Sequence, residues 1–135
     1  MNSQAICKSI TPQFTVSDVV ETAEYYRDVL GFEIRGYWKE PPVFAIVARD
    51  SAEIFFNLAE PGVLPRTGRA PGAYDAYLTV RGIDALAAAL VAQGAEIIDG
   101  PETREYGMRE LVVRDCNGLI LAFGEDAQAS DRPER

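Results

Sequence analysis

The chain has 135 residues, of which 47% are hydrophobic and 25% are charged, and its formal net charge is −8. This length fits one compact domain, and the acidic charge argues against nucleic acid as a partner and suits either a cationic ligand or simple solubility. The sequence shows neither a signal peptide nor an apolar run near the roughly 18 residues of a membrane span, and its two cysteines form no disulfide framework, so we expect a cytoplasmic protein without a membrane partner.

The first half of the chain predicts a strand, a helix and three further strands. Loose alternation over residues 8–16 indicates the first strand. Asp18 stands three residues before Glu21, a spacing typical of a capping box at the start of a helix. One helical face follows and ends at a glycine; it consists of Val20, Ala23, Tyr26 and Leu30, with Gly31 as the stop. The remaining strands are predicted over 32–39, 43–49 and 52–58.

The second half repeats this order. A strand over 73–80 precedes a helix that ends at Gly94 and presents one apolar face, formed by Ile83, Leu86, Leu90 and Val91. Further strands are predicted over 95–99, 108–114 and 119–124. We therefore expect one domain over 1–125, made of module 1 (about 8–60), a proline- and glycine-rich linker (61–72) and module 2 (about 73–125), followed by a flexible tail (126–135).

An internal repeat supports this organisation. Residues 46–60 (IVARDSAEIFFNLAE) align without a gap to residues 111–125 (LVVRDCNGLILAFGE). Four pairs are identical: Val47/Val112, Arg49/Arg114, Asp50/Asp115 and Glu60/Glu125. A period of about half the chain, seen twice, indicates two related halves rather than a solenoid. We expect an α+β fold of two tandem βαβββ modules, with the helices outside a curved mixed sheet that surrounds a cleft.

Two groups of motifs resemble the vicinal oxygen chelate superfamily, which includes glyoxalase I, extradiol dioxygenases, fosfomycin-resistance enzymes and bleomycin-resistance proteins. Residues 16–18 (VSD) and 24–32 (EYYRDVLGF) are similar to the family's V-x-D and FYRDxLGF segments. Residues 106–110 (YGMRE) and 113–118 (VRDCNG) are similar to its W-G-x-R-x and D-P-D-G stretches. The resemblance covers about 9–125 and implies the fold, whereas the fold supports many chemistries.

Catalytic members of this family hold a divalent metal with four side chains, two from each half. By motif position, the resemblance places these ligands at Thr11, Asn57, Asp75 and Ala122. The chain has no histidine, and this set contains one carboxylate, whereas Zn, Ni and Fe prefer nitrogen or several charged ligands. A shifted register would bring Glu53 inward, but displaced along the strand. We therefore expect no metal and no cofactor.

The remaining candidate ligand-binding residues are aromatic or polar. They are Trp38, Phe55, Asn57, Asp75, Tyr77, Tyr106 and Arg109. Trp38 either stacks on a ligand or packs at an edge or dimer contact, and Arg109 either binds an anionic group or forms a surface ion pair. Asn57 and Asp75 accept hydrogen bonds from a ligand, or belong to a network with each other or water. Cys116 has no histidine to act as its base, so nucleophilic catalysis is not expected.

These residues favour a metal-independent protein that binds a small molecule, such as an antibiotic or another aromatic or cationic compound, in the manner of the bleomycin-resistance-like members. The alternative is a lyase, isomerase or dioxygenase of the same superfamily, with a weak or substrate-completed metal site at Asp75 and Asn57 or with acid–base chemistry at Asp75 or Tyr77. A third reading is a non-catalytic subunit whose cleft contacts another protein. The resemblance also implies a homodimer, whose modules pair within one chain or exchange between chains.

Overall fold

The structure, a computed structural model, describes residues 4–63 and 73–128. Module 1 contains β1 (Gln13–Val16), α1 (Val19–Asp28), β2 (Glu33–Trp38), β3 (Phe44–Arg49) and β4 (Ala52–Leu58). Module 2 contains β5 (Ala76–Thr79), α2 (Ile83–Ala92), β6 (Glu96–Thr103), β7 (Met108–Arg114) and β8 (Ile120–Asp126). The predicted order of two βαβββ modules is confirmed.

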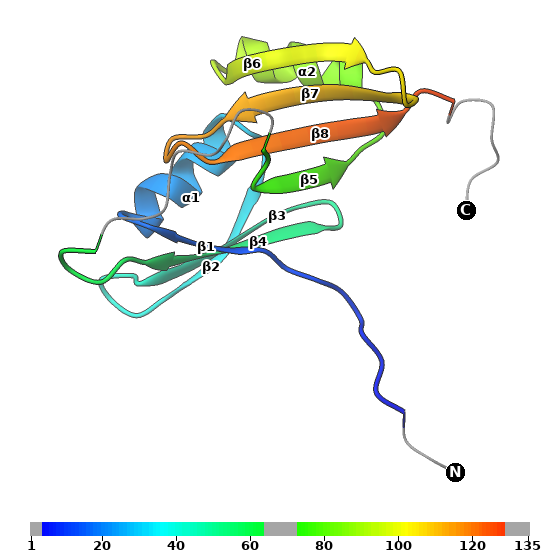
Figure 1. Cartoon of the computed structure of the whole chain (residues 1–135). Coiled ribbons are helices and arrows are strands. Elements are labelled where there is room, and N and C mark those ends of the chain that lie inside the picture. The colour runs from blue at the N-terminus through cyan, green and yellow to red at the C-terminus, as the bar shows by residue number, and fades with distance from the viewer. Residues whose placement is uncertain (1–3, 64–72, 129–135) are drawn as a thin grey trace.

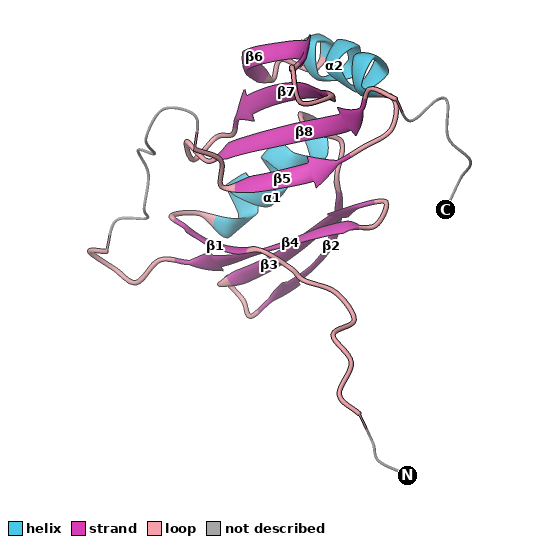
Figure 2. Cartoon of the chain, turned by 45° about the vertical axis from the view of Figure 1, so that its right-hand side comes forward, coloured by secondary structure: helices cyan, strands magenta, loops and turns pink. Residues whose placement is uncertain are grey.

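The strands form two four-stranded mixed sheets. Sheet A has the order β1-β4-β3-β2 and sheet B has the order β5-β8-β7-β6. In each sheet the first strand pairs in parallel with the last, and the other neighbours are antiparallel. Figures 1 and 2 show the sheets as two separate layers with α1 between them. The α+β class is confirmed, and the strands make two sheets rather than one continuous curved sheet.

The two helices begin in different ways. Asp18 is the N-cap of α1, and its carboxylate accepts a hydrogen bond from the Glu21 amide at 2.9 Å, as the capping-box spacing predicts. The N-cap of α2 is Gly82, which has no side chain and a φ of 84°. Glu125 at the end of β8 replaces the missing cap, because its carboxylate accepts hydrogen bonds from the amides of Gly82 and Ile83, each at 3.0 Å.

A single hydrophobic core joins the two modules. It includes residues of both helices and both sheets, with the fully buried Tyr26 ring of α1 packed against Phe32 and Phe56. The Tyr26 hydroxyl donates a 2.6 Å hydrogen bond to Asp115, in the turn between β7 and β8. In the same turn, the side-chain amide of Asn117 donates a 2.9 Å hydrogen bond to the hydroxyl of Thr22 on α1. Module 2 is therefore held to the helix of module 1 by one buried and one partly buried hydrogen bond.

The equivalent turn of module 1, between β3 and β4, differs from the β7–β8 turn. Asp50, the repeat counterpart of Asp115, lies exposed in the β3–β4 turn with a φ of 51°. Between this turn and module 2 lies an open groove of about 900 Å³, which is bordered by β5 and α2. The two halves are thus related in sequence and topology, but their corresponding turns differ. The β7–β8 turn contacts α1 of the other module, whereas the β3–β4 turn borders the open groove.

The N-terminal residues form an extended arm. Residues 4–12 lie outside regular structure and lead away from the sheets (Figure 1), and the side chains of Ile6 and Ile10 are 79% and 92% exposed. The prediction of a strand over 8–16 is therefore wrong for its first part. Pro12 lacks a backbone N–H, and regular pairing with β4 begins only at Gln13.

Several element ends differ from the sequence-based expectations. β6 continues to Thr103, beyond the predicted 95–99, through two irregularities in its pairing with β7. β8 includes Asp126, which the sequence assigned to the tail. The rest of that tail (129–135) and most of the linker (64–72) lie outside the described residues. No helix within the described ranges is long and apolar enough to span a membrane.

Candidate functional site

The face of sheet B that points away from α2 carries an unusual set of side chains, and we call it the helix-free face of sheet B. Alternate residues of a strand point to opposite faces, and Leu111 and Phe123 belong to the core. Their neighbours in the chain therefore belong to the helix-free face: Tyr77 on β5, Glu110 on β7, and Ala122 and Gly124 on β8.

Tyr77 reaches across β8 to Glu110. Its hydroxyl donates a 2.7 Å hydrogen bond to the Glu110 carboxylate, although β8 lies between the strands that carry the two residues. The ring passes directly over Gly124, where an added Cβ would lie 1.8 Å from the Tyr77 hydroxyl oxygen. The absence of a side chain at position 124 therefore creates the path by which Tyr77 reaches its partner.

Two further donors complete the surroundings of Glu110. Tyr106, in the turn between β6 and β7, donates from its hydroxyl at 2.6 Å, and Arg104 donates from Nε at 3.2 Å. Glu110 is only 2% exposed. Burial alone would raise the pKa of this carboxyl, but the hydrogen bonds from Tyr106, Tyr77 and Arg104 outweigh burial and leave the pKa below its ordinary value. Glu110 is therefore a fixed negative charge at neutral pH.

The tyrosines in this group are proton donors rather than bases. Burial and the hydrogen bond to Glu110 raise the pKa of Tyr77 well above its ordinary value. The hydrogen bond to Glu110, together with burial, also raises the pKa of Tyr106. Tyr74 adds a third ring, whose centre lies 6.5 Å from that of Tyr77. We call Tyr74, Tyr77 and Tyr106 around Glu110 the tyrosine cluster.

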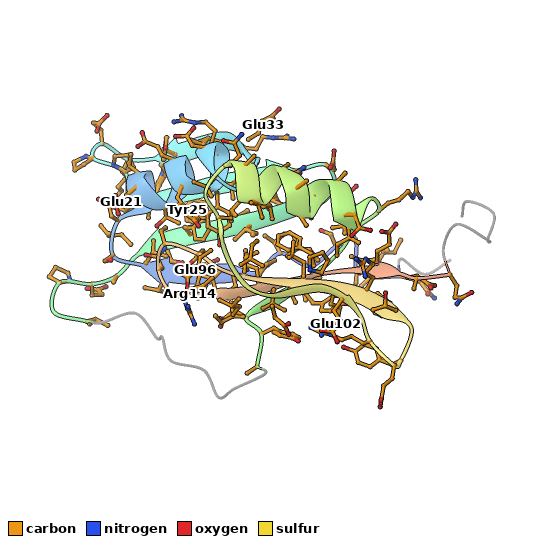
Figure 3. All side chains as sticks on the ribbon, turned by 90° about the horizontal axis from the view of Figure 1, so that it is seen from above. Glu21, Tyr25, Glu33, Glu96, Glu102 and Arg114 are labelled. Atoms are coloured by element: carbon orange, nitrogen blue, oxygen red, sulfur yellow. The ribbon has the colours of Figure 1, made fainter. Side chains whose placement is uncertain are left out.

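Arg104 connects the tyrosine cluster to β6. Its guanidinium forms ion pairs with Asp99 at 2.8 Å and with Glu102 at 3.1 Å, in addition to the contact with Glu110. Figure 3 shows Glu102 at one end of sheet B, far from Glu96 and Arg114, which lie at the other end below Tyr25 of α1. The Arg104 network thus belongs to the end of the sheet that holds the turn between β6 and β7.

The corresponding face of sheet A is aromatic. Phe44 and Phe55 pair their rings at 5.2 Å on adjacent strands, and Trp38 lies on the same face because it pairs with Phe44. Trp38 is 60% exposed, and the Lys39 ammonium lies 4.7 Å from the centre of its ring. Asn57 stands beside these rings. It accepts a hydrogen bond from Gln13 at 2.7 Å and donates to Thr15 at 3.2 Å.

The groove of about 900 Å³ between the modules is bordered by β5, which is an edge strand, and by α2. Its apolar lining includes Ile54, Leu78, Leu86 and Phe123, and its polar rim includes Glu53 and Arg81. Tyr77 also lines the groove. Tyr77 therefore belongs to both the groove and the tyrosine cluster, but the apolar lining of the groove, with Leu78 and Phe123, lies on the core face of sheet B, whereas the tyrosine cluster lies on the helix-free face.

The four positions at which the resemblance places metal ligands do not fit a metal ion. Thr11 lies in the arm before β1, and Ala122 has no donor atom. The Asn57 amide is engaged by its two neighbours on sheet A. The Asp75 carboxylate accepts the backbone N–H of Ile120 at 2.9 Å and so extends the pairing of β5 with β8. In the part of the chain that the structure describes, no group of three or more His, Cys, Asp or Glu side chains is placed to hold a metal.

Two other expected residues also have defined places. Arg109 points to the α2 side of sheet B, where it binds Asp84 at 2.8 Å, and it is therefore not brought together with Tyr77 and Tyr106. This contact is the surface ion pair, one of the two alternatives that the sequence left open. Cys116 is exposed, but partial desolvation of its sulfur and the nearby Asp115 carboxylate raise the pKa of the thiol to about 11, so the group is protonated at neutral pH and poorly nucleophilic.

Sequence reasoning missed the centre of the tyrosine cluster. It identified Tyr77 and Tyr106 but did not assign a role to Glu110, Arg104 or Gly124. Strand alternation separates Arg109 from Glu110, so at most one of the two can point into a site with Tyr77, and the sequence reasoning chose Arg109 of this pair. No comparable signal marks Arg104, since its position depends on the irregular path of β6.

Comparisons with known proteins agree with this architecture. A sequence model of the Glyoxalase/Bleomycin resistance protein/Dioxygenase superfamily matches residues 9–123. A comparison with curated proteins gave no significant match.

Solved structures resemble the whole chain. TioX from Micromonospora sp. ML1 has a TM-score of 0.72 at 16% identity, with 89% of this chain and 99% of TioX covered. A glyoxalase-related enzyme from Clostridium phytofermentans has a TM-score of 0.74 at 18% identity, with coverages of 93% and 99%. A superfamily member from Sphaerobacter thermophilus DSM 20745 has a TM-score of 0.69 at 25% identity, with coverages of 89% and 98%. The chain therefore belongs to the Glyoxalase/Bleomycin resistance protein/Dioxygenase superfamily.

Proposed function

We propose that this protein binds a small organic molecule, aromatic or cationic in character, of which an antibiotic is one example, and that it does so without a metal ion. The observation that carries the proposal is the chemistry at the four expected ligand positions. Ala122 offers no donor, and the Asn57 and Asp75 side chains already hold neighbouring strands together. Binding must then depend on shape, aromatic surface and charge.

Exposed aromatic rings support this proposal. Trp38, Tyr77 and Tyr106 are 60%, 42% and 65% exposed. Exposed large rings are typical of ligand-binding surfaces, and Tyr77 also lines the groove. The groove volume of about 900 Å³ lies within the usual range of such sites. The net charge of −8 adds a general attraction for cations.

Ligand binding is testable through fluorescence, because Trp38 is the only tryptophan of the chain. A panel of aromatic and cationic compounds should include members that quench Trp38 saturably and raise the melting temperature. A Trp38→Phe variant, followed by thermal shift alone, controls for inner-filter effects. A diverse panel that gives neither quenching nor a thermal shift would refute the proposed binding function.

Metal content is a separate test. Protein freed of its purification tag, incubated with Mn, Fe, Ni or Zn and then desalted, should retain clearly less than one metal ion per chain by elemental analysis. Stoichiometric retention of any of these ions would contradict metal independence, and the enzyme alternative would then lead.

The second candidate is a lyase, isomerase or dioxygenase of the same superfamily. It is favoured by Asp75, a carboxylate close to Tyr77 in the chain and at an expected ligand position. The raised pKa of Tyr77 speaks against its use as a base. Turnover of a candidate substrate that rises with added divalent metal and disappears in Asp75→Ala would establish this alternative, whereas unchanged turnover in that variant would remove it.

We also propose that the protein is a cytoplasmic homodimer that binds neither nucleic acid nor membranes. The exposed isoleucines of the arm, Ile6 and Ile10, support association because apolar side chains on an extended segment gain stability by burial. Sedimentation equilibrium should give twice the chain mass, and the double variant Ile6→Ser, Ile10→Ser should weaken the dimer. A chain that stays monomeric at protein concentrations up to about 100-fold above the concentration used in the binding assay would contradict the proposed homodimer.

A further inference from the structure

Among the described residues, the carboxylates around Glu110 outnumber the guanidinium groups that pair with them. Glu110, Asp99 and Glu102 share the single guanidinium of Arg104, at 3.2, 2.8 and 3.1 Å. Three carboxylates and one guanidinium leave an excess of negative charge next to a carboxylate that is almost fully buried. A buried carboxylate is stabilised by a nearby positive charge, so this group has the electrostatic capacity to accept a second cation.

The rings of the tyrosine cluster can supply the other half of a cation site. Tyr74, Tyr77 and Tyr106 are 39%, 42% and 65% exposed, so their π faces remain accessible. The rings of Tyr74 and Tyr77 are inclined at 46° to each other with their centres 6.5 Å apart. Tilted rings at such a spacing present two negative faces to one charged group, and ammonium ions bind such faces within about 6 Å of the ring centre.

The cluster is held rigidly enough to act as a preformed site. The hydroxyls of Tyr77 and Tyr106 are fixed by the two oxygens of the Glu110 carboxylate, Oε2 and Oε1. The Tyr77 ring is confined to the path above Gly124. Preformed groups lose little conformational entropy when a ligand binds, so more of the interaction energy appears as affinity.

Apart from Tyr77, which belongs to both, the tyrosine cluster is separate from the groove between the modules. Leu78 and Phe123 of the groove lining belong to the core face of sheet B, whereas the cluster lies on the helix-free face. A cation bound at the cluster would therefore contact the rings and Glu110 and not the apolar groove wall.

We propose that Tyr74, Tyr77 and Tyr106, arranged around Glu110, form a subsite on the helix-free face of sheet B for the ammonium group of an organic cation. This inference rests on the proposed small-molecule binding function and deepens it, because it assigns the charged group of the ligand to defined residues. It makes these tyrosines determinants of ligand charge, separate from the aromatic face of sheet A.

The experiment compares two probes that differ only in charge. One is a naphthylmethyl group that carries trimethylammonium, and the other is its uncharged isostere, in which carbon replaces the nitrogen. Their Kd values are measured by fluorescence anisotropy of the naphthyl ring at physiological salt. The ammonium probe should bind about tenfold more tightly than the neutral probe, as expected for a cation held by aromatic rings.

Variants of the exposed rings locate the effect. Tyr74→Leu and Tyr106→Leu should each weaken the ammonium probe about three- to tenfold and leave the neutral probe within twofold. Both positions are well exposed, so these variants should fold. Asp84→Asn is the matched control for charge, since it removes one carboxylate from the opposite side of the sheet, where Asp84 pairs with Arg109. It should change neither Kd by more than twofold.

The outcomes separate the two proposals. Equal affinity for both probes in the wild type overturns the ammonium subsite and leaves the small-molecule function standing. A charge preference that Asp84→Asn reduces as much as Tyr106→Leu does also overturns the subsite, because general electrostatic attraction then explains it. If neither probe binds and the wider panel is also silent, both proposals fall. If the only compounds of the panel that bind are neutral, the ammonium subsite is refuted and the small-molecule binding function stands.

Discussion

At the scale of single residues, the main feature is a carboxylate that is buried without losing its charge. Glu110 is 2% exposed and is kept ionised by two phenols and one guanidinium. A buried carboxylate without such donors would be protonated or strongly destabilising. The stability of this part of sheet B should therefore depend on Glu110, and it should do so in a pH-dependent way.

The first prediction concerns that pH dependence. The folded-state pKa of Glu110 lies below its ordinary value of 4.5, so its stabilising contribution is present above pH 4.5 and is lost as the pH falls through the folded-state pKa. Glu110→Gln should lower the free energy of unfolding by about 1–3 kcal/mol at pH 7, because charged hydrogen bonds to a buried group are lost. The difference from the wild type should shrink below pH 4.5.

Urea unfolding at pH 7 and at pH 3.5–4 measures this difference. Arg104 remains in both proteins, so any change with pH reflects the carboxyl at position 110. A difference in unfolding free energy that grows as the pH falls would show that Glu110 is destabilising in its charged form and would contradict the assignment.

The second prediction concerns the coupling of Gly124 with Tyr77. Gly124→Ala should force the Tyr77 ring off its path and lower the free energy of unfolding by about 1–3 kcal/mol, because the Glu110 hydrogen bond is lost. In a Tyr77→Ala background the same change should cost less than about 0.5 kcal/mol, since glycine itself is unfavourable in a strand. A double-mutant cycle with additive effects would show that the two residues do not interact.

At the scale of secondary-structure elements, the sequence correctly predicted those features that depend only on neighbouring residues. The Asp18 cap, the glycine that ends α1 and the alternation of β4 and β7 are all encoded within a few neighbouring residues. The first strand was predicted too long because alternation continues through residues that find no partner on β4. The extension of β6 was missed because its pairing with β7 is irregular.

The tyrosine cluster could not be placed from local signals. Tyr77 and Glu110 come together only through the pairing of β5 with β8 and of β8 with β7. Parallel pairing through a helical crossover leaves no turn signal from which the register of β5 could be read. Sequence alternation shows which residues share a face of one strand, but the match between strands requires the fold.

The third prediction uses the repeat to test the cap of α2. Glu125→Ala should lower the free energy of unfolding by about 1 kcal/mol, because it leaves the amides of Gly82 and Ile83 without their acceptor. Its repeat counterpart Glu60 is exposed, and Glu60→Ala should change stability by less than about 0.5 kcal/mol. Equal effects of the two substitutions, measured by thermal and urea unfolding, would contradict the capping role.

At the scale of the whole molecule, two similar modules share one core but make unequal contacts with each other. The β7–β8 turn binds α1 through Asp115, whereas the β3–β4 turn borders an open groove. Burial raises the pKa of Asp115 even though Tyr26 and backbone amides donate to it. The hydrogen bond from Tyr26 therefore stabilises a carboxylate whose burial is unfavourable, and Tyr26 should be important for stability.

The fourth prediction tests that hydrogen bond. Tyr26→Phe keeps the packed ring but removes the hydroxyl that donates to Asp115, and it should lower the free energy of unfolding by about 1–3 kcal/mol. The adjacent Tyr25 is only partly buried, and Tyr25→Phe is the control, with an expected change below about 0.5 kcal/mol. Unchanged stability in Tyr26→Phe, measured by calorimetry, would show that the contact is energetically neutral.

The extended arm also has a practical consequence, which comes from its cysteine. Cys7 on the arm and Cys116 in the β7–β8 turn are both exposed and are the two cysteines of the chain, but the pKa of the Cys116 thiol is raised to about 11. A maleimide dye at pH 7 should therefore attach mainly to Cys7, with no substitution of the chain. The rotational freedom of that dye would then report directly whether the arm swings in solvent or is immobilised by assembly.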